Sequence, residues 1–430
     1  MIRSVITVLR GSILAQAIGF AVLPLLSRGF SPETFGNFQA FQAIFAFLMI
    51  IVLGRYEIAL LKAEDGKELS AVVTLCGFLG LATTTILVVG SGGALLLGIL
   101  PDYGFAWWLL PASMLAVGAT QILSYLATRD REYSAIANSK TAQGLANAGV
   151  ASLLAAAAPV SSGLVLADLS GRLANAAWLA RRHYSVGLVS RIAGWKEMKA
   201  AALKFRELPI VSLPSALINT AGNSLTPLFI YHTFAAGVSG QFGLAERAIG
   251  LPIALIVAAI SQVHMGHLAA DLRSGGDEAR RSFRKVGLIL AAVSIVPAIG
   301  GLMFSQAIFR VVFGEGWDQA AHFAQLMAPA YFLSLVSGGL NMTLIIVGRQ
   351  RTQLVLDILR FAAMMGLWIY APGAGLAAET IISIHSLLLS LFAVAFMVFA
   401  YRALPDGRGV PLAAVGPDPL ETILPNSSRL

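Results

Sequence analysis

The chain has 430 residues, of which 57% are hydrophobic and only 12% are charged, and its mean hydropathy is +0.77. A water-soluble protein of this composition could not cover its surface with polar side chains, so the soluble classes are excluded. The single cysteine, Cys76, excludes a disulfide within one chain. The formal net charge of +8 comes from Lys and Arg placed in the predicted loops, and no nucleic acid is expected as a partner.

About twelve apolar segments are long enough to cross a bilayer core of about 30 Å as helices. In chain order they lie near residues 8–28, 36–60, 70–99, 105–128, 138–159, 162–181, 208–233, 238–264, 285–309, 321–347, 351–371 and 376–401. Lys and Arg gather at the N-terminus, in the even-numbered loops and in the C-terminal tail, whereas the odd-numbered loops hold only Arg28 and Arg310 as candidates. By the positive-inside rule, both termini are expected on the cytoplasmic side. The sequence therefore predicts an all-α integral membrane protein.

Two sequence echoes predict that the chain is a duplication. Arg129-Asp130-Arg131, followed by Lys140, matches Arg349-Gln350-Arg351, followed by Arg360, at the same spacing. Earlier in each half, the series Pro24, Phe30, Gly36 and Phe38 is matched by Pro227, Phe234, Gly240 and Phe242. Both halves would begin on the cytoplasmic side, which is a parallel repeat of a kind found in transporters.

We expect four parts along the chain: a first six-helix bundle (1–182), a cytoplasmic amphipathic linker (183–207), a second six-helix bundle (208–402) and a disordered tail (403–430). In the linker, one helical stripe collects Ile192, Trp195, Met198, Ala202 and Phe205, with most basic residues off it. Such a helix either lies on the inner membrane surface or is an ordinary solvated connection. The tail is rich in proline and polar residues.

Charged residues inside predicted spans need a reason, because a charge at the bilayer centre costs about 2.5–3.5 kcal/mol on insertion scales. Asp168 and Arg172 are four residues apart, so they share a helix face and form either a structural salt bridge or part of a wet cavity. Glu246 and Arg247 are adjacent and point about 100° apart, so they do not neutralise each other on one face. Arg55 lies at the inner end of its span, where its side chain could reach the interface.

Polar side chains also follow one face of the seventh predicted span, where Asn219 and Asn223 are four residues apart. They are either contacts between helices or a surface that binds sugar hydroxyls. Cavity arginines suit a diphosphate, because the guanidinium donates paired hydrogen bonds. The loop arginines Arg129, Arg131, Arg349 and Arg351 are interpreted as topology anchors or as a cytoplasmic gate. His264 and His267 lack the pattern of a metal site, and we expect no catalytic residue, metal or cofactor.

Several motifs resemble the polysaccharide-transport branch of the multidrug/oligosaccharidyl-lipid/polysaccharide (MOP) exporters, which includes the O-antigen flippases. The resemblance lies in Gly11-Ser12, Leu23 to Arg28, Phe35-Gly36, Gly54 to Leu60 and Phe313 to Trp317. It implies two six-helix bundles that face each other across a cavity, as in the MATE exporters. It also implies that undecaprenyl-diphosphate-linked oligosaccharide moves across the bacterial inner membrane by alternating access. By position, Arg28, Arg55 and Arg247 would line the cavity.

The resemblance implies a lipid-linked oligosaccharide and membrane lipids as partners, with glycan polymerase and chain-length machinery as further candidates. Three alternatives remain. A cation-coupled drug exporter of the same fold would need a buried carboxylate in the first span, and a membrane glycosyl polymerase or ligase would need a large outer loop. A major-facilitator transporter would carry its Gly-rich charged motif near 62–67. None of these features is visible, so a non-enzymatic flippase is the leading hypothesis.

Overall fold

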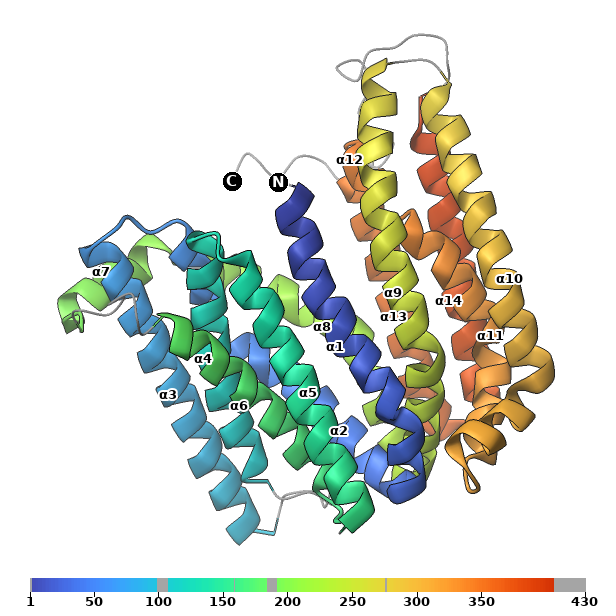
Figure 1. The fold of residues 1–430 in the computed structure, drawn as a ribbon, viewed down its shortest axis with the longest axis horizontal. Coiled ribbons are helices and arrows are strands. Elements are labelled where there is room, and N and C mark those ends of the chain that lie inside the picture. The colour runs from blue at the N-terminus through green and yellow to red at the C-terminus, as the bar shows by residue number, and fades with distance from the viewer. Residues whose placement is uncertain (1, 99–106, 158, 184–191, 275–276, 406–430) are drawn as a thin grey trace. The chain divides into compact units, whose positions relative to one another are not determined.

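The computed structural model describes residues 2–98, 107–157, 159–183, 192–274 and 277–405. Within these ranges the regular structure is helical, and no strand occurs (Figure 1). The contacts divide the chain into two compact units. Unit 1 comprises Met1–Gly243 and Val312–Gly316, and unit 2 comprises Leu244–Val311 and Trp317–Leu430.

Unit 1 contains the helices of the N-terminal part of the chain. They are α1 (Ile2–Gly29), α2 (Pro32–Ile51), the 3-10 helix η1 (Tyr56–Leu61), α3 (Lys67–Leu96), α4 (Leu109–Arg129), α5 (Tyr133–Ala157), α6 (Gly163–His183), α7 (Trp195–Lys204), the π-helix η3 (Leu208–Ser212) and α8 (Leu213–Phe234). Small residues let these helices approach closely: a Cβ at Gly11 would overlap the backbone of Ala137, and one at Gly29 would overlap Ala155. The tight α1–α5 contact follows from these residues.

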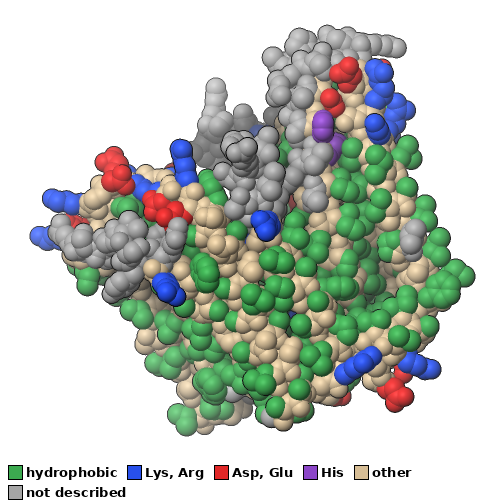
Figure 2. All heavy atoms as spheres, in the orientation of Figure 1, with side chains coloured by type: hydrophobic (Ala, Val, Ile, Leu, Met, Phe, Trp, Pro, Cys, Tyr) green, Lys and Arg blue, Asp and Glu red, His purple; other side chains and the backbone are tan. Residues whose placement is uncertain are grey.

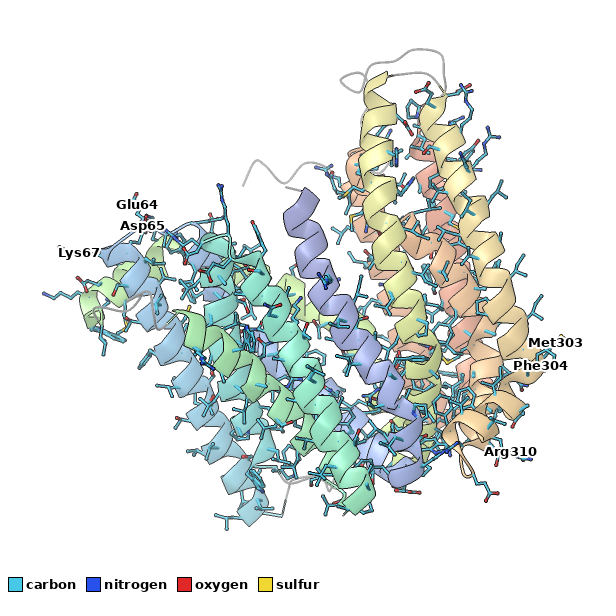
Figure 3. The ribbon with its side chains drawn as sticks, in the orientation of Figure 1. Glu64, Asp65, Lys67, Met303, Phe304 and Arg310 are labelled. Carbon is cyan, nitrogen blue, oxygen red and sulfur yellow. The ribbon has the colours of Figure 1, made fainter. Side chains whose placement is uncertain are left out.

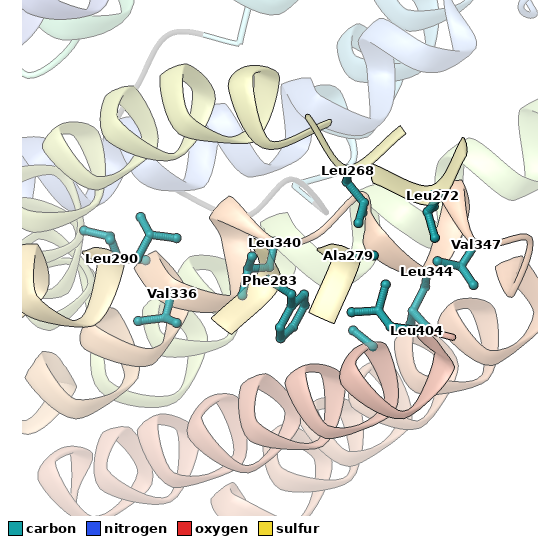
Figure 4. Packing of buried hydrophobic residues seen from close by; sticks show 12 residues of the cluster. Leu268, Leu272, Ala279, Phe283, Leu290, Val336, Leu340, Leu344, Val347 and Leu404 are labelled. Atoms are coloured by element: carbon teal, nitrogen blue, oxygen red, sulfur yellow. The ribbon is translucent and has the colours of Figure 1, made fainter. Parts of the chain in front are cut away.

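Unit 2 holds most of α9 (Ala236–Ser274) and α10 (Glu278–Phe313), with α11 (Asp318–Gly339), α12 (Thr343–Ile346), α13 (Gln350–Gly373) and α14 (Ala378–Ala403). Its apolar core includes Leu268 of α9, Phe283 and Leu290 of α10, Leu340 directly after α11, and Leu344 of α12 (Figure 4). Within a membrane, close van der Waals packing of such side chains stabilises the contacts between helices. The core therefore holds the ends of α9 and α10 against the α11–α12 segment.

Nine helices in the described ranges are long and apolar enough to cross a membrane. Among the long helices, α5, α6 and α8 do not meet that criterion. Large apolar side chains such as Ile86 on α3 and Leu288 on α10 are exposed, as lipid-facing residues would be. Figure 2 shows hydrophobic side chains spread over the visible face and charged ones mostly near helix ends. The chain is an all-α, multi-pass membrane protein, whereas twelve spans and the N-in, C-in orientation stay predictions.

The start of α2 and the start of α9 meet in a reciprocal contact inside unit 1. A Cβ added at Gly36 would overlap the carbonyl oxygen of Ala236, and one at Gly240 would overlap the carbonyl oxygen of Pro32. Gly36 and Gly240 occupy equivalent places in the repeated Phe-x5-Gly-x-Phe pattern. The same sequence offset relates Pro32 to Ala236. Reciprocal contacts of this kind are expected at a two-fold axis, so the equivalent residues of this repeat make equivalent contacts here.

The Arg-x-Arg repeat lies in a different register. Arg129 is the last residue of α4, whereas α12 ends at Ile346, three residues before Arg349. Accordingly Arg131 precedes α5 in a left-handed conformation (φ 59°), while Arg351 already lies in the first turn of α13. The two copies have the same Arg-x-Arg pattern and each lies between two helices or near a helix start, but they do not occupy equivalent positions on those helices.

The predicted boundary between the bundles falls before α8, yet α8 packs against α2 and belongs to unit 1. The division into bundles at 1–182 and 208–402 rests on the repeat in the sequence, and it stays a prediction. The predicted disordered tail lies outside the described residues from 406 onward, and so does the side chain of Asn223.

Candidate functional site

A pocket of about 760 Å³ lies in unit 1 where α2 ends and α8 begins. This volume is in the range of pockets that bind small molecules or substrate headgroups. The lining residues are mostly polar or small: Ile50, Arg55, Glu207, Leu208, Val211, Ser212, Ser215, Ala216, Asn219 and Thr220. Two of the residues singled out in the sequence, Arg55 and Asn219, are therefore brought together here.

A strained turn carries Arg55 into this pocket. Helix α2 ends at Ile51, and Gly54 and Arg55 then adopt left-handed conformations, with φ of 58° and 68°, before η1 begins at Tyr56. Glycine takes this conformation without cost, but a residue with a Cβ rarely does. Strain of this kind tends to persist where the side chain has a function.

The Arg55 side chain makes two long polar contacts. Its Nε donates a hydrogen bond to Ser212 Oγ at 3.4 Å, and its Nη1 lies 3.7 Å from Glu57 Oε1. The Glu57 carboxylate is almost fully buried, and its Oε2 has no hydrogen-bond partner within the described ranges. Both Arg55 contacts exceed the optimal distance, so a stronger anionic acceptor could replace them.

The opposite wall of the pocket is built by η3 and the start of α8. Pro209 lies within η3, and the π-helical turn leads directly into α8. Ser212, Ser215 and Asn219 follow one another at spacings of three and four, which places them on one face. They present hydroxyl and amide groups opposite a guanidinium. Sequence reasoning found Asn219 but missed Ser212 and Ser215, which the same spacing could have identified.

Asp168 and Arg172 on α6 form a closed network with α2. Arg172 Nε donates to Asp168 Oδ2 at 2.6 Å, and Gln42 Nε2 donates to Asp168 Oδ1 at 3.4 Å. The Arg172 guanidinium also stacks 3.9 Å from the centroid of the Phe45 ring. Both charged side chains are largely buried. Of the two interpretations drawn from the sequence, this geometry favours the structural salt bridge.

Other cavity candidates lie elsewhere. Arg28 is exposed in the last turn of α1 and packs over Gly314, at the end of α2 opposite to Arg55. Because α2 has 20 residues, its ends are separated by about 30 Å. Glu246 and Arg247 are half-buried on the part of α9 that belongs to unit 2.

Arg129 contacts the chain segment that follows Arg55. At the end of α4, it donates to the carbonyl oxygen of Leu60 at 2.5 Å and to Asp65 Oδ1 at 2.7 Å. Leu60 is part of η1 and Asp65 follows it, so these bonds link the end of α4 to the segment that follows Arg55. Its repeat counterpart Arg349 precedes α13, and Arg351 is exposed. A role of the four arginines in gating stays a prediction.

The bundle of apolar helices, with a polar pocket near helix ends, defines the class of multi-pass membrane proteins. The fold is similar to that of the lipid II flippase MurJ in an inward closed conformation, with a TM-score of 0.72, 11% identity, and coverage of 92% of this chain and 87% of that one. It is also similar to an inward-facing multidrug resistance MATE family transporter of the MOP superfamily, with a TM-score of 0.63, 13% identity, and coverage of 92% and 97%.

A MOP superfamily transporter from Pyrococcus furiosus gives a TM-score of 0.51 at 11% identity, with coverage of 93% of this chain and 95% of that one. These neighbours are described as transporters or as a flippase, not as enzymes. A search of curated protein sequences gave no significant match. The family model described as polysaccharide biosynthesis protein matches residues 25–322. The match covers more than half of the chain, so the chain belongs to this family of polysaccharide biosynthesis proteins.

Proposed function

We propose that this protein is a flippase that moves undecaprenyl-diphosphate-linked oligosaccharide across the bacterial inner membrane. The product would serve the assembly of a surface polysaccharide, such as O-antigen or exopolysaccharide. The observation that carries the proposal is the Arg55 pocket, in a chain whose family acts in polysaccharide biosynthesis.

The pocket chemistry fits both parts of such a headgroup. The Arg55 guanidinium can donate two parallel hydrogen bonds to diphosphate oxygens, and this is a stronger arrangement than its present contacts with Ser212 and Glu57. Ser215 and Asn219 offer donors and acceptors suited to sugar hydroxyls. The polyprenyl chain would stay in lipid, since its transfer into a polar pocket would be unfavourable.

Transport would follow an alternating-access cycle. Neighbours of this fold are described in inward-facing, inward closed and outward-facing conformations. In this chain, a diphosphate bound at Arg55 would replace the Ser212 contact and so change the link between the end of α2 and η3. Differential binding of this kind is what a ligand needs in order to shift a conformational equilibrium.

The second candidate is a cation-coupled small-molecule exporter, which is favoured by the fold shared with a MATE transporter and by the buried Glu57 carboxylate. It predicts that loss of the gene changes drug sensitivity while lipid-linked glycan still reaches the outer leaflet. The flippase proposal predicts the reverse. Both outcomes can be measured in the same deletion strain.

The test is a leaflet assay in cells that lack the gene. Wild-type protein should restore lipid-linked glycan to the outer leaflet. Arg55→Ala should lower that amount by about tenfold or more at equal protein level, as expected for loss of a charge-assisted contact. Arg55→Lys should be intermediate, because lysine keeps the charge but loses the paired donors.

Arg310→Ala is the matched control, because Arg310 is exposed at the end of α10 and only pairs loosely with exposed Asp318 at 3.6 Å. It should transport like the wild type. Outer-leaflet glycan that persists in the deletion strain, without a second transporter, would overturn the proposal.

A further inference from the structure

The linker helix α7 presents an exposed face that is both cationic and apolar. Trp195 is 65% exposed and Leu203 is 58% exposed. Lys196 and Lys199 are exposed and three residues apart, so they share one side of the helix, and Arg206 is exposed two residues beyond its end. The opposite side holds buried Ala201 with half-buried residues. Of the predicted apolar stripe, Met198, Ala202 and Phe205 are half-buried, whereas Trp195 and Ile192 are mostly exposed.

Contacts along α3 fix this orientation. Trp195 packs edge-on against Phe78, with ring centroids 6.1 Å apart, and the backbone N–H of Ala193 donates to Thr74 Oγ1 at 3.1 Å. At the other end, Lys204 forms an ion pair with Glu68, and this hydrogen bond raises the pKa of Lys204. Lys204 is therefore engaged with the protein, whereas the exposed face carries the other cations.

The position along α3 places α7 at the membrane interface. Helix α3 has 30 residues and is about 45 Å long, which exceeds a hydrocarbon core of about 30 Å. The contacts of α7, and that of Ala193 just before it, lie in the first 12 residues of α3, between Glu68 and Phe78. Figure 1 shows α7 beside the beginning of α3, and Figure 3 labels Lys67 at that end. Tryptophan is typical of this headgroup region.

We propose that the exposed face of α7 binds the anionic phospholipid headgroups of the leaflet at which α3 begins. Lys196, Lys199 and Arg206 would contact lipid phosphates, while Trp195 and Leu203 enter the boundary between headgroups and acyl chains. A cation near an anionic surface contributes about 1 kcal/mol. The charge of this face and its apolar residues fit such a surface better than a soluble acidic partner, which would leave Leu203 and the exposed part of Trp195 in water.

Bound lipid would also act on the pocket wall. The hydroxyl of Tyr56, the residue after Arg55, donates to the carbonyl oxygen of Ala202 on α7 at 3.1 Å. From α7 the chain continues into Glu207 and Leu208, which line the pocket. The lipid contact would therefore steady the pocket wall, whatever substrate enters it.

The experiment uses the full-length protein in nanodiscs, with Cys76→Ser and Ala200→Cys to attach one nitroxide at an exposed position of α7. The measurement is the ratio of spin-label collisions with oxygen to collisions with a water-soluble nickel chelate. In phosphatidylglycerol this ratio should be several-fold higher than in phosphatidylcholine. The double variant Lys196→Gln/Lys199→Gln should lose the difference.

The matched control is Lys62→Gln/Lys67→Gln, which removes the same charge from exposed positions outside α7. It should keep the difference between the two lipids. A label equally accessible to water in both lipids would overturn the proposal, and so would a lipid difference that survives the α7 double variant. A label shielded from both reagents would indicate a protein segment as the occupant, which is also incompatible with it.

Discussion

Arg55 joins a cationic side chain to a left-handed backbone with φ of 68°. The preceding Gly54 already reverses the chain direction, so a second left-handed residue with a Cβ adds strain of about 1–2 kcal/mol. The sequence Gly54-Arg55 marks the turn through its glycine but does not reveal the strain. Such strain is maintained when the side chain is needed where the turn places it.

Arg55→Gly should therefore raise stability relative to Arg55→Ala, because glycine removes the Cβ and alanine keeps it. We expect a difference of about 1 kcal/mol in the free energy of unfolding, with transport lost in both variants. Thermal unfolding of the two proteins in detergent measures it, and the alanine variant serves as the control for loss of the side chain. Equal unfolding temperatures would show that the turn stores no strain.

The Asp168–Arg172 pair permits a test of structural against transport roles. Because both charges are largely buried, Asp168→Asn or Arg172→Gln alone should cost about 3–5 kcal/mol by leaving one charge uncompensated. The double variant should recover part of that loss, and a double-mutant cycle measures the coupling. If the pair is structural, the double variant still transports. Loss of transport at recovered stability would instead place the pair in the substrate path.

The sequence predicts this pair through its spacing of four, but not its partners. Gln42 and Phe45 come from α2, more than 120 positions away in the chain, and they approach only because α2 packs on α6. A spacing rule describes one helix at a time, so contacts between helices are outside its reach.

At the scale of elements, the α2–α9 crossing depends on two glycines. Gly36→Ala and Gly240→Ala each insert a methyl group where the partner carbonyl oxygen already lies. Backbone shifts of this kind cost about 1–3 kcal/mol or more. Each variant should lower the unfolding temperature and the yield of monodisperse protein, measured by fluorescence-detected size-exclusion chromatography.

Gly77→Ala on α3 is the control for that prediction, because a Cβ at Gly77 would meet nothing within 4 Å. Alanine there should be neutral or stabilise the helix by up to about 1 kcal/mol. Equal behaviour of all three variants would mean that the crossing is looser than the structure indicates.

The linker helix α7 shows what hydrophobic periodicity in the sequence can and cannot predict. A hydrophobic stripe identifies α7 as amphipathic, but it does not say which side faces the protein. Trp195 belongs to the predicted stripe and is nevertheless 65% exposed, because the small residue Ala201 makes the close contact. Close packing in a membrane protein favours small residues, so hydropathy alone does not predict which residues of the stripe are buried.

For the whole molecule, hydropathy predicts the helices well because a bilayer forces every spanning segment to satisfy its own backbone hydrogen bonds. The pocket was less accessible to sequence reasoning. It needs the end of α2 beside the start of α8, about 160 residues later, and α8 was assigned to the other bundle. The packing of α8 against α2 is a tertiary contact that neither the charge pattern nor the hydropathy pattern of the sequence predicts.

The orientation in the membrane follows from charge and can be tested directly. Lys67 lies beside a basic predicted cytoplasmic loop, whereas Arg310 precedes a predicted outer turn; both are exposed and labelled in Figure 3. In a Cys76→Ser background, Arg310→Cys should react with a membrane-impermeant maleimide in intact cells with a permeable outer layer. Lys67→Cys should react only after the inner membrane is opened, because positive loops stay inside.

The Cys76→Ser protein without a new cysteine controls for background labelling. The reverse pattern would place the N-terminus outside, and the Arg55 pocket, close to the Lys67 end of unit 1, would then open toward the opposite leaflet from the one at which substrate is made.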